Sequence, residues 1–65
     1  MYTAIPLAQL ERMLEAETRA YVRMSDAAAE HRANGDTAIA ERCQMAAGRH
    51  ASHMKVIQAS IEQRA

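Results

Sequence analysis

Apolar side chains recur every three or four residues along two long stretches of the chain, separated by a short polar break. The first stretch carries this repeat at Leu7, Leu10, Leu14, Glu17, Tyr21, Met24, Ala28 and His31, and the second at Ile39, Cys43, Ala46, His50, His53, Ile57 and Ser60. Spacings of three and four place the members of each set on one face of an α-helix. The pattern therefore predicts two amphipathic helices, residues 4–33 and residues 37–64.

The polar break consists of Asn34, Gly35 and Asp36. Gly35 suits the left-handed residue that ends a helix, and Asp36 suits the N-cap of the next helix. At the start of the chain, Pro6 fits the first turn of a helix capped by Thr3. Because a connection this short makes two helices antiparallel neighbours, residues 34–36 are predicted to be the turn of a helical hairpin.

Both apolar stripes are wider than the seam of a two-stranded coiled coil. The flanking apolar positions are Met13, Ala20 and Ala27 on the first helix, and Ala40, Ala47, Met54 and Ile61 on the second. A lone hairpin would leave half of each stripe in water, whereas a four-helix bundle of two hairpins would bury it. A chain of 65 residues buries too little surface to be stable without further support, and its single cysteine, Cys43, cannot form an intrachain disulfide. A metal or a partner chain could provide that support. We therefore expect an all-α homodimer or higher homo-oligomer.

Charge narrows the classes of partner. Eight basic and eight acidic side chains cancel, so there is no electrostatic reason to expect nucleic acid or an anionic membrane as a partner. No apolar run approaches the roughly 20 residues of a membrane span, and the N-terminus does not resemble a secretion signal. We expect a cytoplasmic protein whose charged residues, such as Arg12, Arg19 and Arg23, form a solvated helix face.

Three residues interrupt the apolar seam with side chains that bind metals: Glu17, His50 and His53. Glu17 lies 18 residues before Gly35, and the histidines lie 15 and 18 residues after it. At about 1.5 Å per residue, all three sit roughly 22–27 Å from the turn, and His50 and His53 project toward one point. Since a buried carboxylate normally pairs or binds metal, this level of the buried seam is predicted to be a metal site. A Glu–His salt bridge without metal is the alternative.

Other polar and sulfur-containing side chains carry weaker signals. Tyr21 lies at the height of His50, where its hydroxyl would either hydrogen-bond a metal ligand or simply reach water. His31 falls near a helix end, four residues before the turn glycine. Cys43 is best read as a small apolar residue, and the methionines, which invite a copper interpretation, as core filler.

Glu17, Tyr21, the turn at residues 34–36 and the pair His50-x-x-His53 occur in a register that resembles half of a rubrerythrin-type ferritin-like domain. The resemblance covers roughly residues 10–57. In that family each hairpin supplies one Glu from its first helix and a Glu-x-x-His pair from its second, and two hairpins enclose a di-iron site. A single hairpin that dimerises around its metal is also similar to the encapsulated ferritins, whose site forms between chains.

One departure changes the chemistry that the resemblance implies, because His50 stands where the family has Glu. A dimer would then offer two Glu and four His, and two carboxylates neutralise one divalent ion, or two ions with an extra anionic bridge such as hydroxide. Imidazole-rich sites favour zinc, copper, nickel or iron over magnesium or calcium. The resemblance implies an inter-chain site for a divalent transition metal, with iron first and zinc or copper as alternatives.

The resemblance also implies an activity if the metal is redox-active, namely oxidation of ferrous iron or reduction of peroxide or oxygen. Two rival functions come from other classes. One is a metal-free helical dimerisation or adaptor module. The other, which the neutral charge disfavours, is a hairpin that binds RNA.

Overall fold

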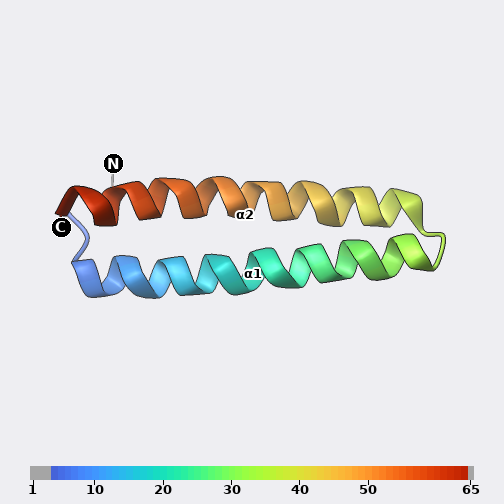
Figure 1. Ribbon diagram of the computed structural model, residues 1–65, viewed down its shortest axis with the longest axis horizontal. Coiled ribbons are helices and arrows are strands. Elements are labelled where there is room, and N and C mark those ends of the chain that lie inside the picture. Colours follow the sequence, from blue (N-terminus) through green and yellow to red (C-terminus); the bar gives the residue numbers. More distant parts are fainter. Residues whose placement is uncertain (1–3, 65) are drawn as a thin grey trace.

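The computed structural model describes residues 4–64 and consists of two α-helices joined by a tight turn. Helix α1 spans Leu7–Ala33 and helix α2 spans Thr37–Arg64. The helices lie side by side and antiparallel, so that the start of α1 and the end of α2 share one end of the hairpin (Figure 1). The predicted antiparallel two-helix hairpin is therefore confirmed for the single chain.

The turn ends α1 with a Schellman motif and starts α2 directly afterwards. The backbone N–H of Asp36 donates to the carbonyl of His31 at 2.8 Å, and that of Gly35 to Arg32 at 3.1 Å. Gly35 has a φ of +83°, in the left-handed region. The carbonyl of Asp36 accepts a hydrogen bond from the N–H of Ala40 at 2.9 Å. Asp36 is thus the N-cap of α2, as the sequence predicted.

Helix α1 begins at Leu7, later than the sequence pattern indicated. Pro6 is the N-cap residue rather than part of the first turn, because its φ of −58° is combined with an extended ψ of 147°. No side chain caps this end of α1 among the described residues. The predicted capping residue, Thr3, lies outside the described part of the chain.

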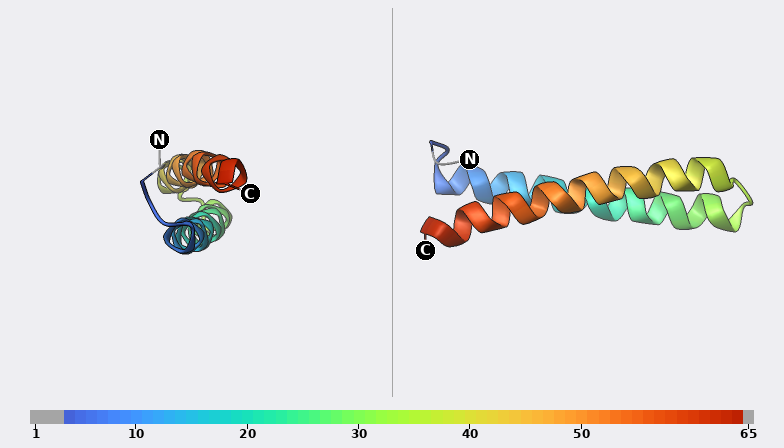
Figure 2. Two further views of the ribbon diagram at one scale, coloured as in Figure 1. Left: turned by 90° about the vertical axis from the view of Figure 1, so that its left-hand side faces the viewer. Right: turned by 90° about the horizontal axis from the view of Figure 1, so that it is seen from above.

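The core between the helices is thin and partly made of alanine. The buried side chains are those of Leu10, Ala28, Ala40, Ala47 and Ile57. On α2, Ala40 and Ala47 were predicted to flank the apolar stripe, but near the turn they are the residues buried against α1. Ile39, which was predicted to lie in the stripe, is 43 % exposed. The predicted phase of α2 is therefore wrong there, because the helices cross rather than run parallel (Figure 2). The residues of α2 that contact α1 therefore lie on a face that shifts gradually round the helix between Ala40 and Ile57.

The hairpin is elongated and exposes apolar side chains. Its extents are 44 × 16 × 14 Å and its radius of gyration is 14.3 Å, against about 10.7 Å for a compact chain of this length. Its accessible surface of 4683 Å² exceeds the roughly 4100 Å² expected of a compact protein of this mass. The large apolar side chains that remain exposed are Leu7, Tyr21, Val22, Ile39 and Met45.

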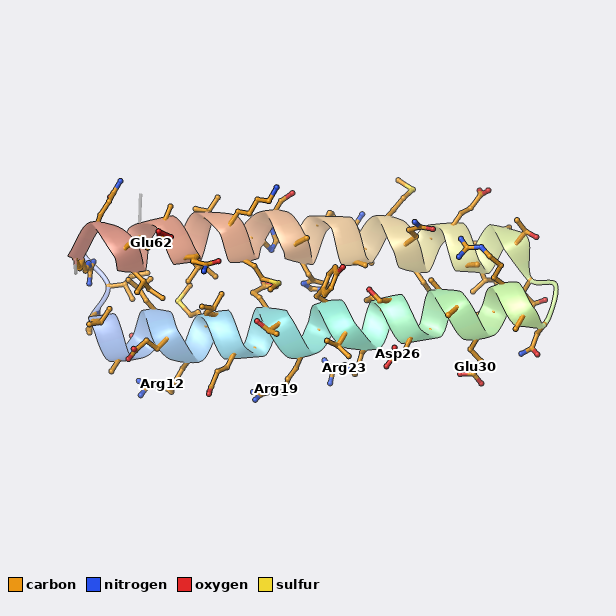
Figure 3. All side chains as sticks on the ribbon, viewed as in Figure 1. Arg12, Arg19, Arg23, Asp26, Glu30 and Glu62 are labelled. Carbon is orange, nitrogen blue, oxygen red and sulfur yellow. The ribbon has the colours of Figure 1, made fainter. Side chains whose placement is uncertain are left out.

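The side of α1 that faces away from α2 is charged. Arg12, Arg19, Arg23, Asp26 and Glu30 all point away from the other helix (Figure 3), which confirms the predicted solvated face. Over the described residues, neither helix combines the length and the apolar character needed to cross a membrane.

Candidate metal centre

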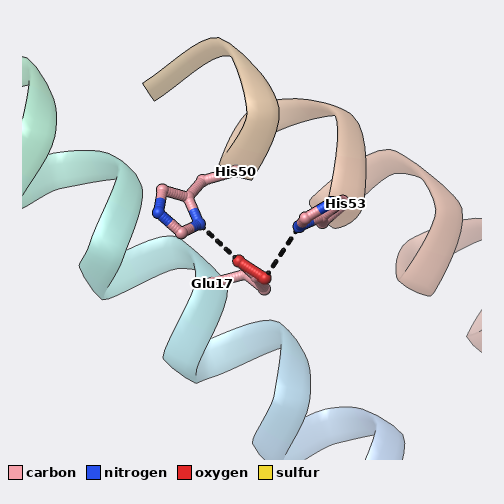
Figure 4. A group of neighbouring side chains, drawn as sticks. All are labelled: Glu17, His50 and His53. Carbon is pink, nitrogen blue, oxygen red and sulfur yellow. Dashed lines mark hydrogen bonds and ion pairs between the residues drawn. The ribbon is translucent and has the colours of Figure 1, made fainter. Parts of the chain in front are cut away.

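Glu17, His50 and His53 meet between the helices (Figure 4), and each lies near the middle of its helix. Nδ1 of His50 lies 2.6 Å from Oε1 of Glu17, and Nδ1 of His53 lies 3.1 Å from Oε2. Each carboxylate oxygen therefore has its own imidazole. The two rings are nearly perpendicular, with centroids 6.2 Å apart and an interplanar angle of 85°. The structure thus brings together the three side chains that the register placed at one height.

Their positions on the helices explain this convergence. Glu17 follows the buried Leu10 by seven residues, or about two turns, and so faces α2. His50 and His53 precede the buried Ile57 by seven and four residues, and so lie on the side of α2 that faces α1. The same periodicity that buries the apolar seam therefore presents the three polar groups to one another.

In the single chain the cluster is half-exposed rather than buried. The exposed fractions of the side chains are 21 % for Glu17, 31 % for His50 and 56 % for His53. His53 is the most exposed because the three positions that separate it from His50 turn it about 60° round the helix. The site is therefore not buried in a hairpin on its own, and its burial in a bundle of two hairpins stays a prediction.

A groove runs beside the cluster on the side where His53 is exposed. Its lining residues are Met13, Ala16, Glu17, His53 and Ile57. Sequence reasoning missed this groove, since it treated Met13 as part of the wide apolar stripe and as core filler rather than as a neighbour of the cluster. The signal that was available is the spacing of four residues between Met13 and Glu17, which puts both on one side of α1.

Hydrogen bonding keeps the carboxylate ionised. The hydrogen bond from His50 is the main cause that lowers the pKa of Glu17 below its ordinary value of 4.5. The hydrogen bond from His53 and the charges of both rings act in the same direction, while burial opposes them. At neutral pH Glu17 is therefore an anionic acceptor for two imidazole N–H groups, which is the metal-free form that the sequence allowed.

The spacing of the ligand atoms also fits a metal ion. One ligand atom from each of the three residues lies within 4.8 Å of the other two. Metal–ligand bonds of about 2.0–2.1 Å at angles of about 90–110° require ligand atoms roughly 3.0–3.4 Å apart. Small side-chain rotations would therefore suffice, and a bound ion would replace the protons that the imidazoles now share with Glu17. Within residues 4–64, no other group of three His, Cys, Asp or Glu side chains gathers in this way.

The other residues singled out in the sequence lie outside the cluster. Tyr21 is 38 % exposed, and in the described part of the chain no hydrogen bond joins its hydroxyl to the three residues, so its role as an outer partner stays a prediction. Nδ1 of His31 lies 3.7 Å from a carboxylate oxygen of Asp36, beside the turn. Cys43 is a free, half-buried thiol.

The fold and the cluster define a class of protein, a two-helix hairpin that carries a carboxylate–imidazole site between its helices. No protein-family model matches the chain, and no curated protein or solved structure matches it either. Its function is therefore inferred from the cluster itself.

Proposed function

We propose that this chain is a small ferritin-like metal-binding protein in which Glu17, His50 and His53 hold a divalent transition-metal ion. The observation that carries the proposal is the placement of two imidazole nitrogens at 2.6 and 3.1 Å from the two oxygens of one carboxylate. Donors of these types suit iron, zinc and copper. Iron is the first candidate because of the resemblance to rubrerythrin-type domains.

A second copy of the chain would complete the site. Glu17 is the eleventh of the 27 residues of α1, so the cluster lies near mid-length. A two-fold rotation perpendicular to the long axis would then bring two clusters face to face, with the turns at opposite ends. The exposure of His53 favours the groove side as the shared face. The elongated shape and the surplus of exposed surface support the pairing.

The charge of such a pair bears on the metal. Two chains would supply two carboxylates and four neutral imidazoles, which balance one divalent ion. A redox-active ion at this site would support oxidation of ferrous iron or reduction of peroxide or oxygen. Because the chain has one cysteine, it lacks a Cys-x-x-Cys relay, and turnover would need an external electron donor.

Elemental analysis coupled to native mass measurement tests the metal. Protein purified without chelator should carry about one ion per two chains, and Glu17→Ala and His53→Ala should lose it. Glu15→Ala is the matched control, since Glu15 is an exposed carboxylate of the same helix, and it should keep the ion. Wild-type protein that holds no metal, and whose melting is unchanged by iron, zinc or copper, would contradict the proposal.

Two exposed alanines of α1 test which face is shared. Ala16 lines the groove beside Glu17 and His53, whereas Ala29 lies in a hollow on the other side of the hairpin. Ala16→Arg should weaken self-association in sedimentation experiments, because it places a charge on the shared face, and Ala29→Arg should not. The reverse result would assign the interface to the opposite side.

The alternative function is a metal-free dimerisation or adaptor module. One observation favours it: both oxygens of Glu17 already have hydrogen-bond partners without any ion. Chelator separates the two functions, because a metal-bridged pair should dissociate or melt at a lower temperature when its ion is removed. A dimer that is indifferent to chelator and to Glu17→Ala would favour the module.

A further inference from the structure

We propose that a single chain binds copper(I) at the cluster, through the imidazoles of His50 and His53 and, from the neighbouring groove, the thioether of Met13. The proposal rests on the proposed function, because it uses the same cluster, but it concerns a monovalent ion held by one chain, whereas the divalent ion of the proposed function lies between two chains. Glu17 supplies the balancing negative charge.

The placement of Met13 is the first step. Met13 lines the groove together with Glu17 and His53, and it is half-buried. It precedes Glu17 by four residues, so its side chain lies one turn away on the same side of α1. Of the four methionines in the described part of the chain, Met13 alone lines this groove. A soft sulfur donor is thus available at the side of the cluster that is open to solvent.

Charge balance is the second step. Within the described residues the cluster contains one carboxylate, that of Glu17, and no other acidic group joins it. Two neutral imidazoles and a neutral thioether leave one negative charge per chain, which a monovalent ion neutralises. A divalent ion would leave one positive charge in the groove unless a second chain brought another carboxylate.

Donor type and geometry are the third step. Thioethers select copper(I), and imidazole suits copper as well. A three-coordinate ion with metal–nitrogen bonds of about 2.0 Å needs nitrogens about 3.5 Å apart, and ligand nitrogens of His50 and His53 lie within 4.8 Å. The rings are 31 % and 56 % exposed, so they have room to close this difference by rotation.

Competition for copper(I) with bicinchoninate, under anaerobic conditions with excess ascorbate, tests the proposal. All proteins would carry Cys43→Ala, because a thiolate also binds copper(I). Met13→Leu keeps an apolar side chain of similar size, and Met54→Leu is its matched control, since Met54 is also half-buried and lies one turn from a histidine ligand. Circular dichroism would verify that both variants are folded.

We expect one copper(I) per chain and a loss of affinity of about tenfold or more in Met13→Leu, with Met54→Leu within about twofold of the parent. Zinc affinity should be the same in all three proteins, since zinc does not need the thioether. Copper X-ray absorption should show a sulfur neighbour that Met13→Leu lacks.

Equal copper(I) affinities for Met13→Leu and Met54→Leu would overturn the copper proposal, as would a parallel loss of zinc and copper in Met13→Leu. Either result would leave the metal site of the proposed function standing if zinc still binds and Glu17→Ala abolishes its binding. A parent protein that takes neither iron(II), zinc nor copper(I) would overturn both.

Discussion

The two glycines offer the same substitution at positions with opposite backbone requirements. Gly35 joins the helices with a φ of +83°, whereas Gly48 lies inside α2. An added Cβ would meet no atom within 4 Å at either position. Contacts within the hairpin therefore do not decide the outcome, and the difference between the two alanine variants should arise from the backbone alone.

The magnitudes follow from the conformation at each site. Gly48→Ala should raise the free energy of unfolding by about 0.5–1 kcal/mol, because alanine loses less conformational entropy in a helix. Gly35→Ala should lower it by about 1–2 kcal/mol, the cost of holding an L-residue in the left-handed region. At about 4–8 °C per kcal/mol for a domain of this size, the Tm values should differ by at least about 6 °C.

Thermal melts followed by far-UV circular dichroism provide the measurement. Both variants and the parent should be melted at one protein concentration, because self-association makes Tm depend on concentration. Equal Tm values for the two variants would refute the assignment of left-handed strain to position 35. A lower Tm for Gly48→Ala would refute the claim that position 48 is open.

Three further predictions, made with four substitutions, test the cluster, the core and the surface. The pKa of Glu17 is lowered on folding from its ordinary value of 4.5, so its ionised form stabilises the folded chain above that value, and this contribution is lost as pH falls through the lower folded pKa. Glu17→Gln should therefore flatten the acid limb of stability against pH; an unchanged limb would contradict the ion pairs. Leu10→Ala should lower the free energy of unfolding in urea titrations by about 2–4 kcal/mol because Leu10 is fully buried. Leu7→Ala, at a position that is 42 % exposed, should cost far less, and equal losses would refute the assigned core. Arg32→Ala should lower the free energy of unfolding by less than about 0.5 kcal/mol in the same titration, since the 2.8 Å hydrogen bond from Arg32 to Gln44 is exposed. A loss above about 1 kcal/mol would contradict the view that this hydrogen bond contributes little to stability.

The turn was the most predictable part of the fold, because its chemistry is local. A left-handed glycine followed by an N-capping Asp36 signals the end of one helix and the start of another, wherever the helices then go. The phase of α2 was less predictable. Ile39 and Ala40 are adjacent and both apolar, and the crossing of the helices, which depends on the whole contact, decides that Ala40 faces α1 and Ile39 faces outward.

The sequence register likewise predicted some properties of the cluster and not others. Counting residues from Gly35 placed Glu17, His50 and His53 at one height, because the rise per residue is constant and the turn is short. Their exposure and the groove beside them did not follow from counting. Both depend on how far each side chain lies from the line of closest contact, and so on the crossing of the helices.

The cluster also bears on the stability of the hairpin. Ion pairs between partly exposed groups contribute about 0–1 kcal/mol, whereas burial of one large apolar side chain contributes about 1.5–3 kcal/mol. Within residues 4–64 the only large, fully buried side chains are those of Leu10 and Ile57. Three polar groups at mid-length therefore occupy positions where apolar side chains would add stability. A bound ion would offset this loss, since metal that binds only the folded chain adds its binding free energy to folding. The thin core and the polar cluster are thus explained together if a bound metal stabilises the fold, whereas in a metal-free module the ion pairs of Glu17 would contribute only about 0–1 kcal/mol.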